Sequence, residues 1–366
     1  MLHQSTRSNI PQFLPTDKES MDFSAKDAIS ILRKVCDWQV QNLQDSFTRL
    51  SGRREKILNN GWIRSVFFIG VMAFWKSTND QQYLKAASKW AEENAWIPGP
   101  HPRLADDHCA GQTYTELYFI YKDKKMIQAI QKTFDRMIAE PRQGRDEWYW
   151  CDALFMAPPV LARLSAATQD RRYLDFMNIL WWGTAELLYD RECALFFRDQ
   201  NYIIQPDGAG PREKNGQKIF WSRGNGWVMA GIVRVLQFMP NDYHARQEFI
   251  QLFKEMAEAV SKLQHIDGLW RASLLDPDNF PACETSGSAL FCYAFAWGIN
   301  NGILDRETYF PVVEKAWQGL MECVDDTGRL GWVQLPGDGA RLVNKTDSME
   351  YGTGAFLLAG SEIIKF

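Results

Sequence analysis

The sequence has no apolar run of the roughly 18 residues that a membrane-spanning helix requires. Its first 20 residues are polar, contain Pro11 and Pro15, and lack the apolar core of a secretory signal peptide. The simplest expectation is therefore a cytoplasmic protein, or a periplasmic one if a signal peptide has been removed. A membrane is not an expected partner.

Patterns typical of metal and nucleic-acid binding are also missing. The five histidines form no metal-ligand cluster, and the seven cysteines include no CxxC pair. The formal net charge is −4, so no basic surface for nucleic acid is expected. We therefore expect no metal, no cofactor, no disulfide framework and no nucleic-acid partner.

Aromatic residues, in contrast, are abundant. The chain of 366 residues contains 15 Trp and 22 Phe, and 46% of its residues are hydrophobic. Aromatic side chains bury large areas and also offer flat faces to ligands. This composition predicts a large core and is compatible with a sugar-binding site.

Helical periodicity dominates the chain after an irregular arm at residues 1–22. Helices that are apolar all round alternate with amphipathic helices. The amphipathic ones begin after a recurring turn that contains Asp80, Asp123 and Asp170, spaced roughly 45 residues apart. About six helical hairpins are expected.

Six hairpins can form an open solenoid or a closed (α/α)6 barrel. The all-apolar helices suit an inner ring, and the apolar segment at residues 354–359 is unlike the polar cap of a solenoid. We therefore predict an all-α fold, one (α/α)6-barrel domain over residues 23–366. Short β segments are expected in long loops, including 195–198 and 202–204, whereas the basic stretch at 53–56 is expected to be a loop.

Polar and aromatic side chains stand at the start of every predicted inner helix. These starts are Gly61-Trp62, Asp106-Asp107, Trp150-Cys151-Asp152, Trp221 to Trp227, Glu284-Thr285-Ser286 and Tyr351 to Gly354. If the inner helices run parallel, the six starts meet at one mouth of the barrel. Helix N-termini there favour an anionic ligand.

Asp152 lies in the most distinctive of these starts, between two tryptophans and an apolar helical pattern. It could be a helix N-cap that accepts a backbone N–H. It could instead be a catalytic acid whose pKa is raised in an aromatic pocket. The other acids could likewise be caps, the tryptophans core residues, and the glycines close-packing residues.

Four motifs together resemble glycoside hydrolase family 105, the unsaturated rhamnogalacturonyl hydrolases. They are Asp106 to Gln112, Trp150 to Met156, Trp221 to Trp227 and Gly352 to Ala355. The resemblance spans the chain from about residue 25. It implies an (α/α)6 barrel without metal that acts on oligosaccharides ending in a 4,5-unsaturated uronic acid left by a polysaccharide lyase.

The resemblance also implies roles for individual residues. Asp152 is the expected general acid/base, which protonates C4 while water adds to C5; the hemiketal then opens and releases the aglycone. The second family carboxylate falls in the Asp106-Asp107 pair, where Asp107 is the expected catalytic residue. The substrate-binding residues expected are Trp62, Asp106, Trp150, Met156, Trp221, Arg223, Trp227 and Thr353. The family's histidine has no counterpart, because residues 190–200 contain none, and the insertion at 200–218 is a candidate determinant of subsite preference.

Other functions stay open on the sequence alone. A sugar isomerase of the same architecture needs histidine bases, and His108 is the only candidate beside a motif. An inverting glycosidase needs two carboxyl groups on opposite sides of the bond. A carbohydrate-binding helical protein would use Asp152 only as a cap. The sequence does not indicate the uronic acid, the linkage or the oligomeric state.

Overall fold

The computed structural model describes residues 24–49, 51–142 and 144–366, and the arm expected at 1–22 lies outside them. The helices are α1 Ala25–Gln41, α2 Trp62–Thr78, α3 Gln81–Glu93, α4 Ala105–His108, α5 Ala110–Tyr121, α6 Lys125–Ala139, α7 Gly144–Glu147, α8 Ala153–Met156, α9 Pro158–Thr168, α10 Arg172–Leu188, α11 Ser222–Leu236, α12 Arg246–Ser261, α13 Thr285–Asn300, α14 Arg306–Glu322 and α15 Glu350–Ile363. The strands are β1 Ser46–Thr48, β2 Arg54–Lys56, β3 Tyr189–Asp190 and β4 Leu195–Phe196. Two short 3-10 helices span Gln200–Tyr202 and Pro277–Asn279.

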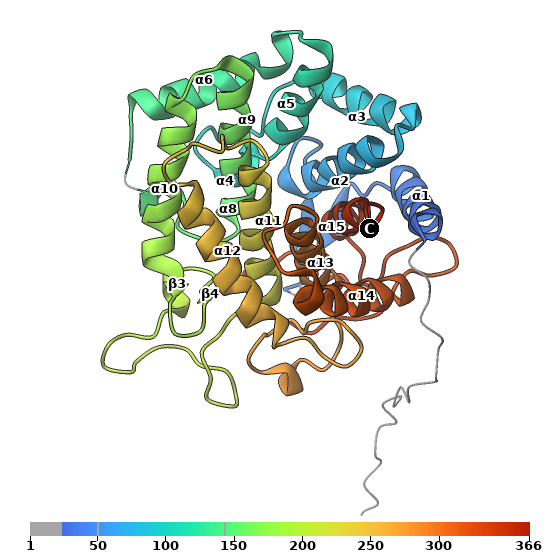
Figure 1. The fold of residues 1–366 in the computed structure, drawn as a ribbon, viewed down its shortest axis with the longest axis vertical. Coiled ribbons are helices and arrows are strands. Elements are labelled where there is room, and N and C mark those ends of the chain that lie inside the picture. Colours follow the sequence, from blue (N-terminus) through green and yellow to red (C-terminus); the bar gives the residue numbers. More distant parts are fainter. Residues whose placement is uncertain (1–23, 50, 143) are drawn as a thin grey trace, which may run out of the picture.

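Six helices form a closed inner ring, in the order α2, α5, α9, α11, α13 and α15 (Figure 1). Each packs against the next, and α15 packs against α2 to close the ring. The helices α1, α3, α6, α10, α12 and α14 surround them. The predicted (α/α)6 barrel is therefore confirmed.

The two rings differ in burial as their sequences do. Every residue of α13 from Thr285 to Ile299 is buried, whereas the outer helix α3 buries one stripe of its surface. This difference follows the rule that an all-apolar helix is enclosed by others and an amphipathic one faces water on one side. Within the described ranges, no helix has the length and apolarity needed to cross a membrane.

The recurring turn predicted from the sequence connects inner to outer helices at three places. In each, the residue that ends an inner helix has a left-handed backbone, and the following aspartate accepts a hydrogen bond from a backbone N–H two residues further on. The pairs are Asn79-Asp80, Lys122-Asp123 and Gln169-Asp170. The internal repeat thus has a common local geometry.

Some local predictions were wrong. The stretch at 53–56 is not a loop, because β2 pairs antiparallel with β1 in a hairpin. β4 pairs with β3 as an expected strand, but residues 202–204 form none. The helix predicted to enter at Ala105 is interrupted at Cys109, and the helix after Asp152 is interrupted at Ala157, just before two prolines at the start of α9.

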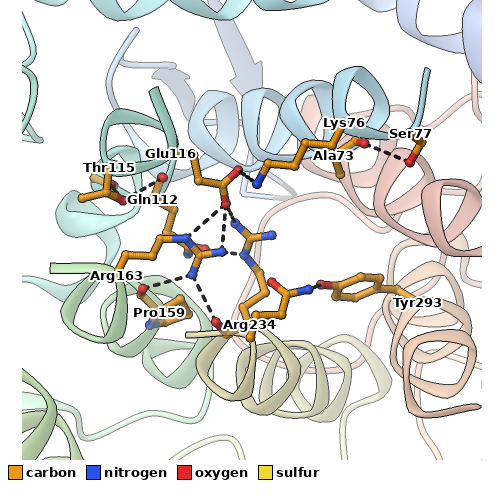
Figure 2. A network of polar contacts seen from close by, with 12 residues as sticks. Ala73, Lys76, Ser77, Gln112, Thr115, Glu116, Pro159, Arg163, Arg234 and Tyr293 are labelled. Carbon is orange, nitrogen blue, oxygen red and sulfur yellow. Dashed lines mark hydrogen bonds and ion pairs between the residues drawn. The ribbon is translucent and has the colours of Figure 1, made fainter. Parts of the chain in front are cut away.

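A buried ionic network connects four inner helices (Figure 2). Glu116 of α5 accepts hydrogen bonds from Lys76 of α2 at 2.7 Å, Arg163 of α9 at 2.8 Å and Arg234 of α11 at 2.7 Å. Burial alone would raise the pKa of Glu116, but the three cations hold it well below its ordinary value. Glu116 is therefore ionised and links the inner ring from inside.

Candidate active site

A cavity of about 500 Å³ opens where the inner helices begin, within the 300–1,000 Å³ typical of ligand pockets. Its walls come from the starts of α2, α4, α8 and α11, from the β1–β2 hairpin and from the loop at 336–338. Seven predicted site residues line it: Trp62, Asp106, Asp107, Trp150, Asp152, Met156 and Arg223. The predicted residues Trp221, Trp227 and Thr353 do not.

Asp152 immediately precedes α8, and its side chain is 13% exposed. It makes no capping hydrogen bond to the helix that follows. Oδ2 accepts a weak bond from the Cys151 thiol at 3.5 Å and lies 3.9 Å from Nε of Arg198. Burial raises the pKa of Asp152, and the nearby Arg198 and Arg223 oppose that rise.

The two neighbouring acids of α4 have different environments. Oδ2 of Asp107 accepts the backbone N–H of His101 at 2.7 Å and lies 2.8 Å from Nδ1 of the same histidine. Asp107 therefore holds the loop before α4. The Asp106 carboxyl has no hydrogen-bond partner among the described residues, and burial, with the charges of Asp152 and Asp107, raises its pKa to about 7.

Arg223, at the start of α11, is almost completely buried in the cavity wall. Its guanidinium donates to the carbonyl oxygens of Gln334 and Leu335 and stacks on the rings of Trp221 and Tyr351, 4.5 and 4.9 Å from their centroids. Trp221 also donates to the Gln334 side chain at 3.1 Å. Trp221 thus supports Arg223 and the loop from behind the cavity surface.

Of three further predicted substrate-binding residues, one faces the cavity and two lie behind its surface. Trp62 faces the cavity and packs on Tyr351, with ring centroids 4.9 Å apart. Trp227 lies behind it, edge-on to the Trp62 ring at 6.5 Å. The hydroxyl of Thr353 donates to Gln39 of outer helix α1 at 2.8 Å, and so it is directed away from the cavity.

Two polar residues near the motifs have structural positions. Glu284 caps α13 by accepting the backbone N–H groups of Ser286 at 2.9 Å and Gly287 at 2.6 Å. His108 is fully buried, bonds to the Pro102 carbonyl and has its pKa lowered to about 4 by burial. His108 does not line the cavity, so the isomerase alternative lacks its candidate base.

Sequence reasoning missed several cavity residues. Arg198 lines the cavity, but the prediction for residues 190–200 considered only whether they contain a histidine and did not consider this arginine. His101 precedes the Asp106-Asp107 motif closely enough to have been considered. Lys56 was noticed only as part of a basic stretch and Arg49, just after β1, was not noticed, because strands of three residues show too little alternation to be predicted.

Comparison with known proteins agrees with this fold. The model for Glycosyl Hydrolase Family 88 matches residues 31–366. The chain therefore belongs to that family and is a glycoside hydrolase, which confirms the predicted enzyme class.

Two similar curated proteins share one name with each other, unsaturated 3S-rhamnoglycuronyl hydrolase. An unsaturated 3S-rhamnoglycuronyl hydrolase of Formosa agariphila is 40% identical over 319 residues, covering 83% of this chain and 84% of the relative. A protein of that name from Alteromonas sp. is 34% identical over 387 residues, covering 99% and 92%. The predicted resemblance to unsaturated uronyl hydrolases is thereby confirmed.

Two solved structures superpose closely. A family 88 glycosyl hydrolase from Bacteroides vulgatus has a TM-score of 0.84 and 30% identity, covering 93% of this chain and 99% of that one. A structure titled as a polysaccharide lyase has a TM-score of 0.83 and 30% identity, covering 93% and 97%. The name of this second protein differs from the hydrolase names of the other relatives.

Proposed function

We propose that this protein removes a 4,5-unsaturated uronic acid from the non-reducing end of lyase-generated oligosaccharides. Asp152 carries the proposal, because it is a mostly buried carboxyl group at the cavity wall that does not cap its helix. Its raised pKa suits a group that must donate a proton near neutral pH. Asp152 protonates C4, water adds to C5 and gives its proton to the Asp152 carboxylate, and the resulting hemiketal opens and releases the aglycone.

We propose Asp106, in place of the expected Asp107, as the second carboxyl group of the reaction. Asp107 is engaged with His101, whereas Asp106 is free to contact substrate and shares the negative potential of Asp152. Trp62, Trp150 and Met156 then form the apolar wall against which a sugar ring packs. The aglycone proposed is a 3-sulfated rhamnose, on the names of the two curated relatives.

The test follows the ultraviolet absorbance of the conjugated enol ether on a lyase-generated unsaturated uronyl-rhamnose disaccharide, with and without the 3-sulfate. Wild-type protein should abolish the absorbance, and faster with the sulfated sugar. Asp152→Asn should lose most of the rate, about 10²-fold or more, while its thermal unfolding stays unchanged. Asp305→Asn, a distant N-cap of α14, is the matched control and should keep full activity.

The sign of the absorbance change also tests the lyase alternative. A lyase creates the C4=C5 double bond and raises the absorbance of an intact polysaccharide, whereas the proposed hydrolase consumes the bond. A rise on intact sulfated polysaccharide, with no change on the disaccharide, would overturn the proposed function. Equal loss by wild type and Asp152→Asn would keep the reaction but remove Asp152 from it.

A further inference from the structure

Arg198 is fixed beside Asp152 by main-chain contacts on both sides. The amide of Asn225, in α11, accepts the Phe196 N–H at 2.7 Å and donates to the Phe196 carbonyl at 3.0 Å. Trp150 and Asp199 form an antiparallel bridge, and the Cys151 N–H donates to the Arg198 carbonyl at 2.8 Å. The strand segment that carries Arg198 is therefore aligned with the segment that carries Asp152.

The Arg198 guanidinium has hydrogen-bond acceptors for only some of its N–H groups among the described residues. Nη1 donates to Asp199 at 2.6 Å, and Nε lies 3.9 Å from Asp152 Oδ2, too far for a hydrogen bond. Nε is buried without a hydrogen-bond partner among the described residues, although the side chain lines the cavity and is 21% exposed. A buried donor without a partner is costly, which indicates that another group bonds to it at some stage.

We propose that Arg198 binds the carboxylate of the unsaturated uronic acid and shares its charge between that carboxylate and Asp152. This inference rests on the proposed function. The sugar carboxylate is attached to C5, next to the C4 atom that receives the proton, so the group that binds it must lie close to the catalytic acid. Arg198 meets this requirement, and a guanidinium fork suits a carboxylate.

Arg223, the other cavity arginine, is less suited to this role. Its terminal nitrogens already donate to the carbonyls of Gln334 and Leu335, and its ring contacts enclose it. The Nε of Arg223 is likewise buried without a hydrogen-bond partner among the described residues, but both of its terminal nitrogens donate to the loop, whereas in Arg198 only Nη1 has an acceptor there. Arg223 therefore supplies a fixed positive charge, and Arg198 supplies the bonds.

The shared charge couples substrate binding to the protonation of Asp152. The charged groups that face Asp152 are Arg198, Arg223 and Asp106, with the Cys151 thiol adjacent. Without substrate, the Arg198 charge favours the ionised form of Asp152. When the sugar carboxylate pairs with Arg198, that effect is neutralised and Asp152 takes up a proton from solvent. The acid is thus protonated when the anionic substrate is bound.

Kinetics on the unsaturated disaccharide and on its methyl ester, which lacks the negative charge, test the inference. Wild type should prefer the acid, and Arg198→Gln should raise KM for the acid about tenfold to hundredfold and leave KM for the ester nearly unchanged. Arg198→Lys keeps the positive charge but lacks the guanidinium fork, and so its KM for the acid should lie between those of wild type and Arg198→Gln. Arg136→Gln, on the exposed surface of outer helix α6 and outside the cavity wall, is the matched control.

The pH profiles give a second readout that a purely structural role would not change. In wild type, the acid-group pKa from kcat should exceed that from kcat/KM, because these report the bound and free enzyme. In Arg198→Gln the kcat/KM value should rise towards the kcat value. Circular dichroism checks folding, and Arg198→Lys carries the test if Arg198→Gln unfolds.

The two possible failures are distinguishable. Retention of the preference for the acid over the ester in Arg198→Gln would overturn the role of Arg198 and leave the proposed function intact. Consumption of neither substrate by wild type would overturn the proposed function itself.

Discussion

Glu284 directly precedes the inner helix α13, and Asp152 directly precedes α8, the short helix before the inner helix α9, yet only Glu284 is a cap. Glu284 has an extended backbone, with φ −125° and ψ 110°, from which its side chain reaches the free N–H groups of α13. Asp152 already has helical angles, φ −61° and ψ −29°, and makes no such bond. The choice depends on backbone geometry set by the flanking loops, which residue spacing does not reveal.

The adjacent acids Asp106 and Asp107 also show that residue spacing does not reveal what each side chain contacts. Both are at the start of α4, and the sequence identified the pair correctly as part of the cavity wall. Which carboxyl is free depends on how residues 98–102 fold back, because the backbone and ring of His101 bind Asp107. That contact is tertiary, so the sequence alone does not show which of the two carboxyl groups is free.

Asp106 gives a prediction for the pH dependence of stability. Its native pKa of about 7 lies above the ordinary 3.8, so between these values the folded protein holds a proton that the unfolded chain has released. The free energy of unfolding should therefore fall as pH rises through this range. In Asp106→Asn this component disappears, and urea unfolding at several pH values should show a smaller loss than in wild type.

Asp305 is the contrasting control for that experiment. Hydrogen bonds from Thr308 lower the pKa of Asp305, so the stability it contributes is present above its unfolded pKa and is lost as pH falls. Asp305→Asn should thus change the profile in the opposite direction. Identical pH profiles for wild type and Asp106→Asn would contradict the prediction.

At the scale of elements, the strong signals in the sequence were the long periodic ones. The alternation of all-apolar and amphipathic helices predicted the inner and outer rings, and the turns at Asp80, Asp123 and Asp170 predicted where hairpins join. The β1–β2 hairpin escaped prediction although it forms a wall of the cavity. Its strands have only three residues each, which is too short for an alternating pattern to appear in the sequence.

The network around Glu116 was likewise invisible in sequence, because its members come from four helices that meet only in the closed ring. Glu116→Gln leaves the buried cations Arg163 and Arg234, with Lys76, without their shared anion. Such a loss typically costs about 3–5 kcal/mol. Denaturant unfolding should show a large fall in stability, and expression of soluble protein is expected to fall with it.

The matched control is Glu258→Gln on the surface of α12. It removes an exposed pair with Lys262, the C-cap residue four positions further along, where both side chains are more than half exposed. Exposed pairs of this kind contribute little to stability, because solvent screens the two charges. Comparable losses in the two variants would show that the buried network is not a principal support of the ring.

At the scale of the whole molecule, closure of the barrel joins the two ends of the described chain. Arg64 of α2 forms a bidentate, buried ion pair with Glu350 of α15, with both distances 2.9 Å. The same two helices approach so closely that a Cβ on Gly354 would lie 2.2 Å from the Val66 carbonyl oxygen. Packing therefore requires glycine at position 354, in agreement with the interpretation that the glycines of these motifs are close-packing residues.

Gly354→Ala tests whether this contact holds the ring together. The added methyl group meets backbone atoms that cannot rotate away, so α2 and α15 must separate, at a cost of about 3 kcal/mol. Because α15 and α2 belong to opposite ends of the chain, the strain should act on the entire ring: unfolding should remain a single transition at a lower midpoint, with faster thermal inactivation.

The matched control is Gly208→Ala, in an open loop where an added Cβ has no atom within 4 Å. Because Gly208 has φ +84°, a left-handed conformation that alanine disfavours, this variant should lose about 1 kcal/mol of stability. A midpoint for Gly354→Ala no lower than that of Gly208→Ala would show that the two helices can move apart freely, and that closure of the barrel depends on its other contacts.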